Sequence, residues 1–192
     1  MANWQCLKVK KIFDSPWVRL EQHLVRTPAG REFPHVVIHA GPSAMVVPVR
    51  DDGRIVITRE YRYPTRCWNY QLPGGGTDGA RPDVAARREL REETGYVARR
   101  LEKLGRFVVY SGLSSEWCHV FLATGLRLGS QQLEHSEQIT VRAVSWPELE
   151  RMIAANRFRD GMSLAALAMA RHRLRAVTEN HKATKNTKAT KK

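Results

Sequence analysis

A run of three glycines just before a carboxylate-rich helix constrains the fold and the chemistry of this chain most. The glycines are Gly74–Gly76, and a helical pattern of residues begins at Pro82. Gly95 follows the last periodic residues, a position where glycine commonly ends a helix. A glycine-rich turn lets the backbone approach a phosphate closely and frees its carbonyls to act as ligands. We therefore expect a turn and a helix suited to phosphate and metal chemistry.

Three glutamates of the predicted helix share one face. Glu89 stands three residues before Glu92 and four before Glu93, a spacing that brings side chains together on a helix. Exposed like charges at this spacing repel by only about a few tenths of a kcal/mol, so a solvated acidic face is the alternative. Clustered carboxylates are hard oxygen ligands that suit Mg²⁺ or Mn²⁺. Zinc is disfavoured, because no cysteine and histidine pair stands at ligand spacing and the histidines show no metal spacing.

This stretch resembles the box of the Nudix hydrolases, G-x5-E-x7-R-E-U-x-E-E-x-G-U, in which U is an apolar residue. The positions that match in register are Gly74, Arg88, Glu89, Leu90, Glu92, Glu93 and Gly95, with Tyr96 at the last position. One position departs from the box, because Ala80 replaces its first glutamate, an outer contact of the metal site. The carboxylates of the helix are retained, which favours an active enzyme over a sensor that binds nucleotide without cutting it.

The resemblance is strongest to the branch that hydrolyses ADP-ribose and other nucleoside diphosphate sugars. It rests on residues 60–64, on the loop 110–116 and on the strand 119–123 that follows this loop. It implies an α+β Nudix fold, a mixed β-sheet sandwiched between helices, with a small N-terminal antiparallel β appendage. The implied reaction is metal-dependent hydrolysis of the diphosphate linkage, for ADP-ribose to AMP and ribose 5-phosphate. Alternatives are a Nudix hydrolase of nucleoside triphosphates, dinucleoside polyphosphates or capped RNA, and the non-catalytic sensor.

The pattern of apolar residues predicts the elements that surround this box. Two hairpins are expected, one turning at Pro28–Gly30 and one at Asp51–Gly53, because these are turn sequences. The segment between the second hairpin and the glycines is poor in apolar residues, and we predict no strand there. The expected strands are Trp17–Val25, Phe33–Ile38, Ala44–Val49, Ile55–Tyr61, Leu101–Val109, Trp117–Thr124 and Ile139–Ser145. Further helices are expected at Pro147–Ala155 and from a cap at Ser163 to about Arg175.

Three parts are expected along the chain. Residues 1–42 form the appendage, which in this branch usually pairs with its twin in a homodimer. Residues 43–177 form the Nudix domain, and residues 178–192 form a basic, disordered tail. The resemblance also assigns the metal site: Glu89 and Glu93 bind Mg²⁺ or Mn²⁺, the Gly74 carbonyl completes the site, and Glu92 shares the cluster as a catalytic residue. Arg88 is expected to hold these carboxylates by ion pairing.

The remaining site residues are expected outside the box. Glu116 is the candidate general base, and Glu137 competes with it for that role. Arg62 is a candidate phosphate ligand, with an ordinary exposed strand arginine as the alternative. Trp17 and Phe33 are candidates to sandwich the base of the substrate across the dimer, although an appendage also needs aromatic residues for packing.

The charge of the chain bears on its other partners. Thirty-two basic residues against 19 acidic ones give a net charge of +13, part of it in the lysine-rich tail. The tail permits weak contact with nucleic acid, or it is simply solvated. No membrane contact is expected, because no apolar run approaches about 18 residues. The three cysteines form no CxxC pair and suggest no disulfide framework, which favours a cytoplasmic location.

Overall fold

The computed structural model describes residues 3–133 and 138–174, so the basic tail and Glu137 lie outside the described residues. The strands are β1 Gln5–Asp14, β2 Val18–Arg26, β3 Glu32–Ala40, β4 Ser43–Pro48, β5 Ile55–Arg62, β6 Cys67–Gln71, β7 Gly74–Gly76, β8 Tyr96–Val108, β9 Trp117–Leu128 and β10 Ile139–Val144. The helices are α1 Pro82–Thr94, α2 Trp146–Ala154 and a further helix over residues 161–174. Within the described residues, none of the helices is long and apolar enough to cross a membrane.

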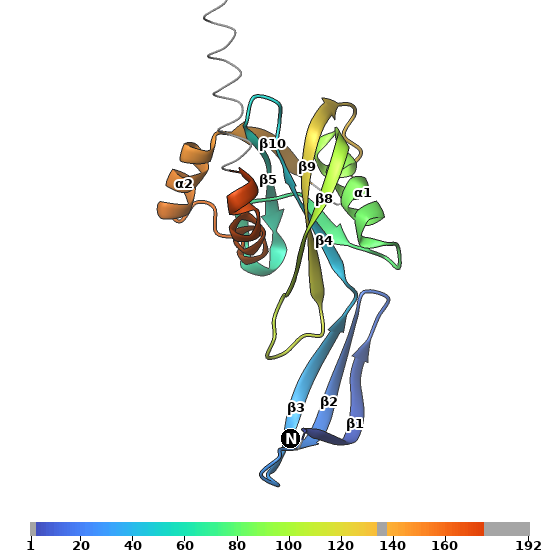
Figure 1. The fold of residues 1–192 in the computed structure, drawn as a ribbon. Helices are drawn as coiled ribbons and strands as arrows, with labels where there is room; N and C mark the ends of the chain where they lie inside the picture. Colours follow the sequence, from blue (N-terminus) through green and yellow to red (C-terminus); the bar gives the residue numbers. More distant parts are fainter. Residues whose placement is uncertain (1–2, 134–137, 175–192) are drawn as a thin grey trace, which may run out of the picture.

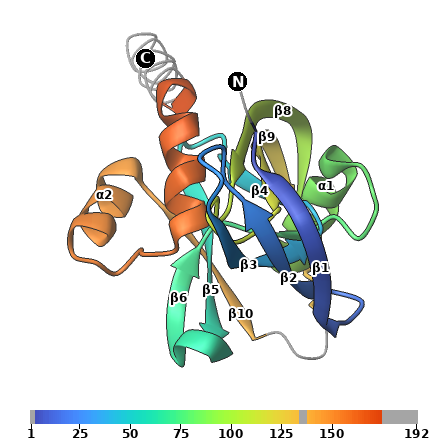
Figure 2. The same cartoon turned by 90° about the horizontal axis from the view of Figure 1, so that it is seen from below.

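Strand β4 lies at the centre of the body, because all six of its residues are buried. Successive side chains of a strand point to opposite faces. Ala44 and Val46 therefore pack in a cluster with Leu90 of α1, whereas Met45 and Val47 belong to the larger core with α2 and the last helix. Figure 2 shows α1 and α2 on opposite sides of the strands. The predicted α+β fold, with strands between helices, is confirmed.

The strands of the body form two sheets rather than one. A four-stranded mixed sheet has the order β7-β4-β9-β8, with β4 parallel to β9, and a three-stranded antiparallel sheet has the order β10-β5-β6. The predicted hairpin of β4 and β5 is therefore wrong, because the two strands do not pair. Only a single bridge next to the turn joins Val49 to Ile55. Both edges of β4 are occupied by β7 and β9, so β5 pairs elsewhere.

Strands β1, β2 and β3 form an antiparallel sheet that projects from the body (Figure 1). The predicted antiparallel N-terminal segment is confirmed, and β1 adds a strand that the sequence pattern did not predict. Every residue of β1 is exposed. The sheet is joined to the loop before β9 by two backbone hydrogen bonds: Ile38 N donates to Leu113 O at 2.8 Å, and Ser115 N donates to Ile38 O at 3.0 Å.

The segment before the box helix also differs from its prediction. Residues 63–71 contain a 3-10 turn and strand β6, and the three glycines form strand β7 instead of a turn. Helix α1 begins at Pro82, and Gly95 ends it with a φ of 73°, as predicted. The last helix is not capped by Ser163, because Asp160 Oδ1 accepts hydrogen bonds from Ser163 N at 2.8 Å and from its Oγ at 2.6 Å.

Candidate active site

Two adjoining clefts open where strand β7 faces helix α1. The smaller cleft, of about 370 Å³, is lined by Glu60, Arg62, Gly74, Gly75, Gly76, Asp78, Arg88, Glu89, Glu92 and Glu93. The larger cleft, of about 830 Å³, extends from the same glycines past Ser43 and Glu116 to Trp17 and Ala40 at the base of the appendage. Arg62, Asp78 and the glycine strand line both clefts, so the two are continuous.

The glycine strand lies too close to its neighbours for larger residues. A Cβ added to Gly74 would lie 2.4 Å from the backbone oxygen of Ala44 on β4. A Cβ added to Gly75 would lie 2.8–3.0 Å from the carboxylate of Glu89. The glycines therefore bring backbone against a carboxylate of α1, a close approach that only a residue without Cβ allows.

Arg88 connects the glycine strand to the carboxylates. Its Nη2 donates to Gly76 O, to Asp78 Oδ2 and to Glu89 Oε1, each at 2.7 Å, and its Nε lies 3.7 Å from Glu92 Oε2. The hydrogen bond to Glu89, opposed by partial burial, raises the pKa of Arg88 above its usual range. Arg88 is thus charged at any physiological pH and positions carboxylates from two segments.

Glu89, Glu92 and Glu93 line the smaller cleft from consecutive turns of α1. Glu93 is the most buried of the three, with 4% of its surface exposed. The carboxylate oxygens of this lining are of the kind that hard cations prefer as ligands. Among the described residues, no cysteine or histidine lines either cleft.

Arg62 is held at the junction of the two clefts. Its Nη2 lies 3.0 Å from Glu60 Oε2, and its Nε donates to Gln71 Oε1 at 3.1 Å. Gln71 in turn donates to Glu60 Oε2 at 2.8 Å. Sequence reasoning missed Glu60 and Gln71, because their contact depends on the pairing of β5 with β6.

Glu116 lines the larger cleft but not the smaller one. Its Oε1 accepts a hydrogen bond of 2.7 Å from Ser43 Oγ, and its backbone N–H donates to Ser114 Oγ at 3.1 Å. These bonds fix the carboxylate at the start of β9, beside β4. The competing base, Glu137, lies outside the described residues.

The two aromatic candidates lie at different ends of the appendage. Trp17 is 81% exposed and lines the larger cleft. Phe33 contacts the rings of Trp4 and His35 instead. It precedes the cleft residue Ala40 by seven positions along β3, which corresponds to roughly 23 Å of extended strand. Within one chain, Phe33 is therefore not brought to the site.

A family model for the NUDIX domain matches residues 39–166, about two thirds of the chain. The chain belongs to the NUDIX family. An ADP-ribose pyrophosphatase of Bacillus subtilis is 27% identical over 82% of this chain and 87% of that protein. An ADP-ribose pyrophosphatase of Mycobacterium tuberculosis is 33% identical over 79% of this chain and 72% of that protein. The predicted family, its ADP-ribose pyrophosphatase branch and the enzyme class, a Nudix pyrophosphatase, are confirmed.

A solved structure described as an ADP compounds hydrolase has the same fold. It superposes with a TM-score of 0.82 at 20% identity, covering 92% of this chain and 96% of that one. The similarity includes both the N-terminal sheet and the Nudix domain, because so little of either chain is left uncovered.

Asp78 is the residue of the Nudix box that sequence reasoning missed. Ala80, which replaces the first box glutamate, is exposed and belongs to neither cleft lining. Asp78 stands two residues before Ala80 and has a left-handed backbone conformation, with a φ of 50°. It lines both clefts, and its carboxylate forms an ion pair with Arg88. The available signal was an acidic residue directly before the turn glycine Gly79.

Proposed function

We propose that this Nudix hydrolase cleaves the diphosphate linkage of a nucleoside diphosphate sugar, and that ADP-ribose is its preferred substrate. The observation that supports this most is the continuity of the two clefts. The smaller, carboxylate-lined cleft suits a diphosphate with its cations, and the larger cleft leaves room for a nucleoside or sugar. The relatives named as ADP-ribose pyrophosphatases, which match along most of their length, support the same substrate.

The smaller cleft fits a divalent cation, Mg²⁺ or Mn²⁺. Arg88 contacts the carboxylates of three residues that line this cleft, Asp78, Glu89 and Glu92. Clustered carboxylate oxygens are the hard ligands that Mg²⁺ and Mn²⁺ prefer, and Glu93 adds a fourth carboxylate to the lining of this cleft. Glu89, Glu93 and the Gly74 carbonyl would hold the ion, with Glu92 alongside. When bound, a divalent ion supplies charge neutralisation at the diphosphate and a more acidic water.

Residues outside the box would complete the reaction. The Arg62 guanidinium, oriented by Glu60 and Gln71, would bind a phosphate where the clefts meet, because guanidinium groups match phosphate oxygens. Glu116 would take the proton of the attacking water, held for this by the hydroxyl of Ser43. Attack on phosphorus then breaks the phosphoanhydride, and the two products are AMP and ribose 5-phosphate.

The appendage would serve in a homodimer. Strand β1 exposes four apolar side chains on the two faces of the sheet, those of Leu7, Val9, Ile12 and Phe13, and a monomer would leave them in water. In a dimer, Phe33 would reach the larger cleft of the other subunit and stack on the base from the side opposite Trp17. Phe33 would then contact the substrate, which it cannot do within a single chain.

A substrate panel tests the proposed function. It contains ADP-ribose, ADP-glucose, GDP-mannose, NADH, a diadenosine polyphosphate and nucleoside triphosphates, each assayed with Mg²⁺ and with EDTA. We expect release of AMP from ADP-ribose to be the fastest reaction and EDTA to abolish it. Faster turnover of another nucleotide would assign the enzyme to that substrate, and ligand binding without any product would favour a sensor.

A further inference from the structure

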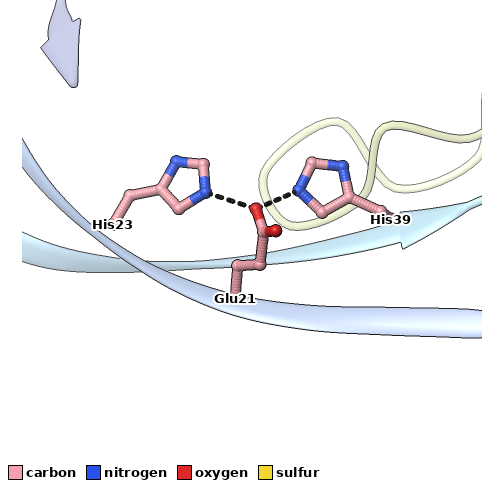
Figure 3. Close-up of side chains that lie close together, drawn as sticks. All are labelled: Glu21, His23 and His39. Atoms are coloured by element: carbon pink, nitrogen blue, oxygen red, sulfur yellow. Dashed lines mark hydrogen bonds and ion pairs between the residues drawn. The ribbon is translucent and has the colours of Figure 1, made fainter. Parts of the chain in front are cut away.

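Three side chains of the N-terminal sheet converge away from both clefts. Glu21 Oε2 lies 2.9 Å from His23 Nε2 and 2.8 Å from His39 Nε2 (Figure 3). The three ligand atoms all lie within 4.8 Å of one another, and all three residues are half-buried. Two imidazole nitrogens and one carboxylate oxygen therefore meet at a single point.

The pairing of β2 with β3 creates this cluster. Glu21 and His23 are two residues apart on β2, so they share one face of the sheet. His39 lies opposite Arg19 in the register of β2 and β3, which places it on the same face and diagonal to Glu21. The sequence spacing of 16 residues between the histidines gives no sign of this contact. No metal spacing was found among the histidines in the sequence because only distances along the chain were considered there.

The carboxylate at the centre is oriented and charged. Arg19 Nε lies 3.0 Å from Glu21 Oε1, which leaves Oε2 facing the two histidines. The hydrogen bond from His23, together with that from His39 and the charge of Arg19, lowers the pKa of Glu21 against a smaller opposing effect of burial. Outer contacts of this kind fix the orientation of metal-ligating carboxylates.

We propose that Glu21, His23 and His39 form a transition-metal site, with Zn²⁺ as the fitting ion, separate from the carboxylate cleft. Three such ligands leave a fourth position for water or another group. Ligand atoms around a tetrahedral ion with bonds of about 2.0–2.1 Å lie about 3.3 Å apart. The present separations of 2.8 and 2.9 Å need to widen by only roughly half an ångström. The donor set differs from the oxygen-only cleft, so the two sites select different metals.

The position of this site gives a bound ion a structural role. None of its three residues belongs to the described lining of either cleft. His39 follows Ile38, whose backbone bonds the loop that ends in Glu116. An ion between His39 and the β2 ligands would tie β2 to β3 one residue from this joint. Zinc should therefore stabilise the protein, because an ion that binds only the folded state adds to its stability.

The test is zinc binding to the full chain in millimolar Mg²⁺, which is added to compete with zinc for the carboxylate cleft. Calorimetric titration compares the wild type with His39→Ala and Glu21→Gln, and with the control His172→Ala, which removes an exposed histidine of the last helix. We expect the wild type and the control to bind one Zn²⁺ that both cluster variants bind at least tenfold more weakly. Titration with Co²⁺ should give visible absorption typical of a four-coordinate site only in the wild type and the control.

Two results would overturn the proposal: no zinc binding by the wild type under these conditions, or equal binding by the wild type and Glu21→Gln. The Glu21→Gln side chain keeps its shape and its hydrogen-bonding ability, so this variant decides the matter if His39→Ala fails to fold. Melting temperatures provide a second readout. Zinc should raise that of the wild type and leave that of Glu21→Gln unchanged, and a similar rise in both would also contradict the site.

Discussion

At Gly75, a single substitution should reduce turnover and leave the fold intact. Gly75→Ala places a methyl group 2.8–3.0 Å from the Glu89 carboxylate, a flexible side chain that can move. We expect the fold to survive and turnover to fall by about tenfold to 100-fold, because small displacements of catalytic groups are costly. Turnover and thermal unfolding of the purified variant measure the two effects.

Gly74→Ala is the contrasting variant for stability, because its methyl group would meet the backbone oxygen of Ala44 at 2.4 Å rather than a side chain. It should lower the free energy of unfolding by about 1–3 kcal/mol, the usual cost of overpacking. Unchanged turnover in Gly75→Ala would show that the position of Glu89 does not limit the reaction.

Asp78 should substitute for the missing box glutamate through its bond to Arg88. Asp78→Asn removes one of the charges that orient Arg88, and we expect turnover to fall by about 10–100-fold, as for other outer partners of metal ligands. Asp83→Asn is the control, because Asp83 pairs with the exposed Arg81 at the start of α1. Equal rates for the two variants would mean that Ala80 leaves the box without a replacement.

The residues of the candidate site differ in how far the sequence alone predicted them. The shared face of Glu89, Glu92 and Glu93 follows from helical spacing, because all three belong to one regular element. Asp78 and the cluster of Glu21 with its histidines depend on loop geometry and strand register, which no local pattern contains. The sequence alone therefore could not predict the contacts that depend on long-range strand pairing.

Among the elements, the last helix fixes the segment that leads into the glycine strand. Ser163 is fully buried, and its Oγ accepts a hydrogen bond of 2.8 Å from Leu72 N. Ser163→Ala leaves this buried N–H without its partner, which should lower the free energy of unfolding by about 1–3 kcal/mol. Denaturant unfolding measures the loss, and Ser130→Ala, at an exposed position, is the control. Equal stability of both variants would contradict this role.

Sequence patterns predicted the elements better than their pairing. The helix from Pro82 to Gly95 has a start and a stop signal, and it appears as expected. The hairpin of β4 and β5 failed because both edges of β4 are taken by strands distant in sequence. Strand β7 was missed because it consists of three glycines, and β6 was missed because it has only five residues, in which just Trp68 and Tyr70 mark the alternation.

For the whole molecule, the exposed apolar residues of β1 should mediate assembly. Phe13→Asp places a charge among these residues, and we expect a dimeric wild type to become a monomer in sedimentation experiments. Leu128→Asp changes a more exposed apolar residue, on β9, and should leave the dimer intact. A wild type that sediments as a monomer, or a dimer insensitive to Phe13→Asp, would disprove the proposed interface.

The carboxylate cleft is tested most directly by turnover of ADP-ribose in Mg²⁺ by the wild type and by Glu93→Gln. Removing this buried charge should lower the rate by more than about 100-fold, beyond the effect of an outer contact, while the melting temperature shows a folded protein. Glu150→Gln, at an exposed position of α2, should turn over at the rate of the wild type. Magnesium-dependent release of AMP that persists in Glu93→Gln at a near-normal rate would contradict the proposed site.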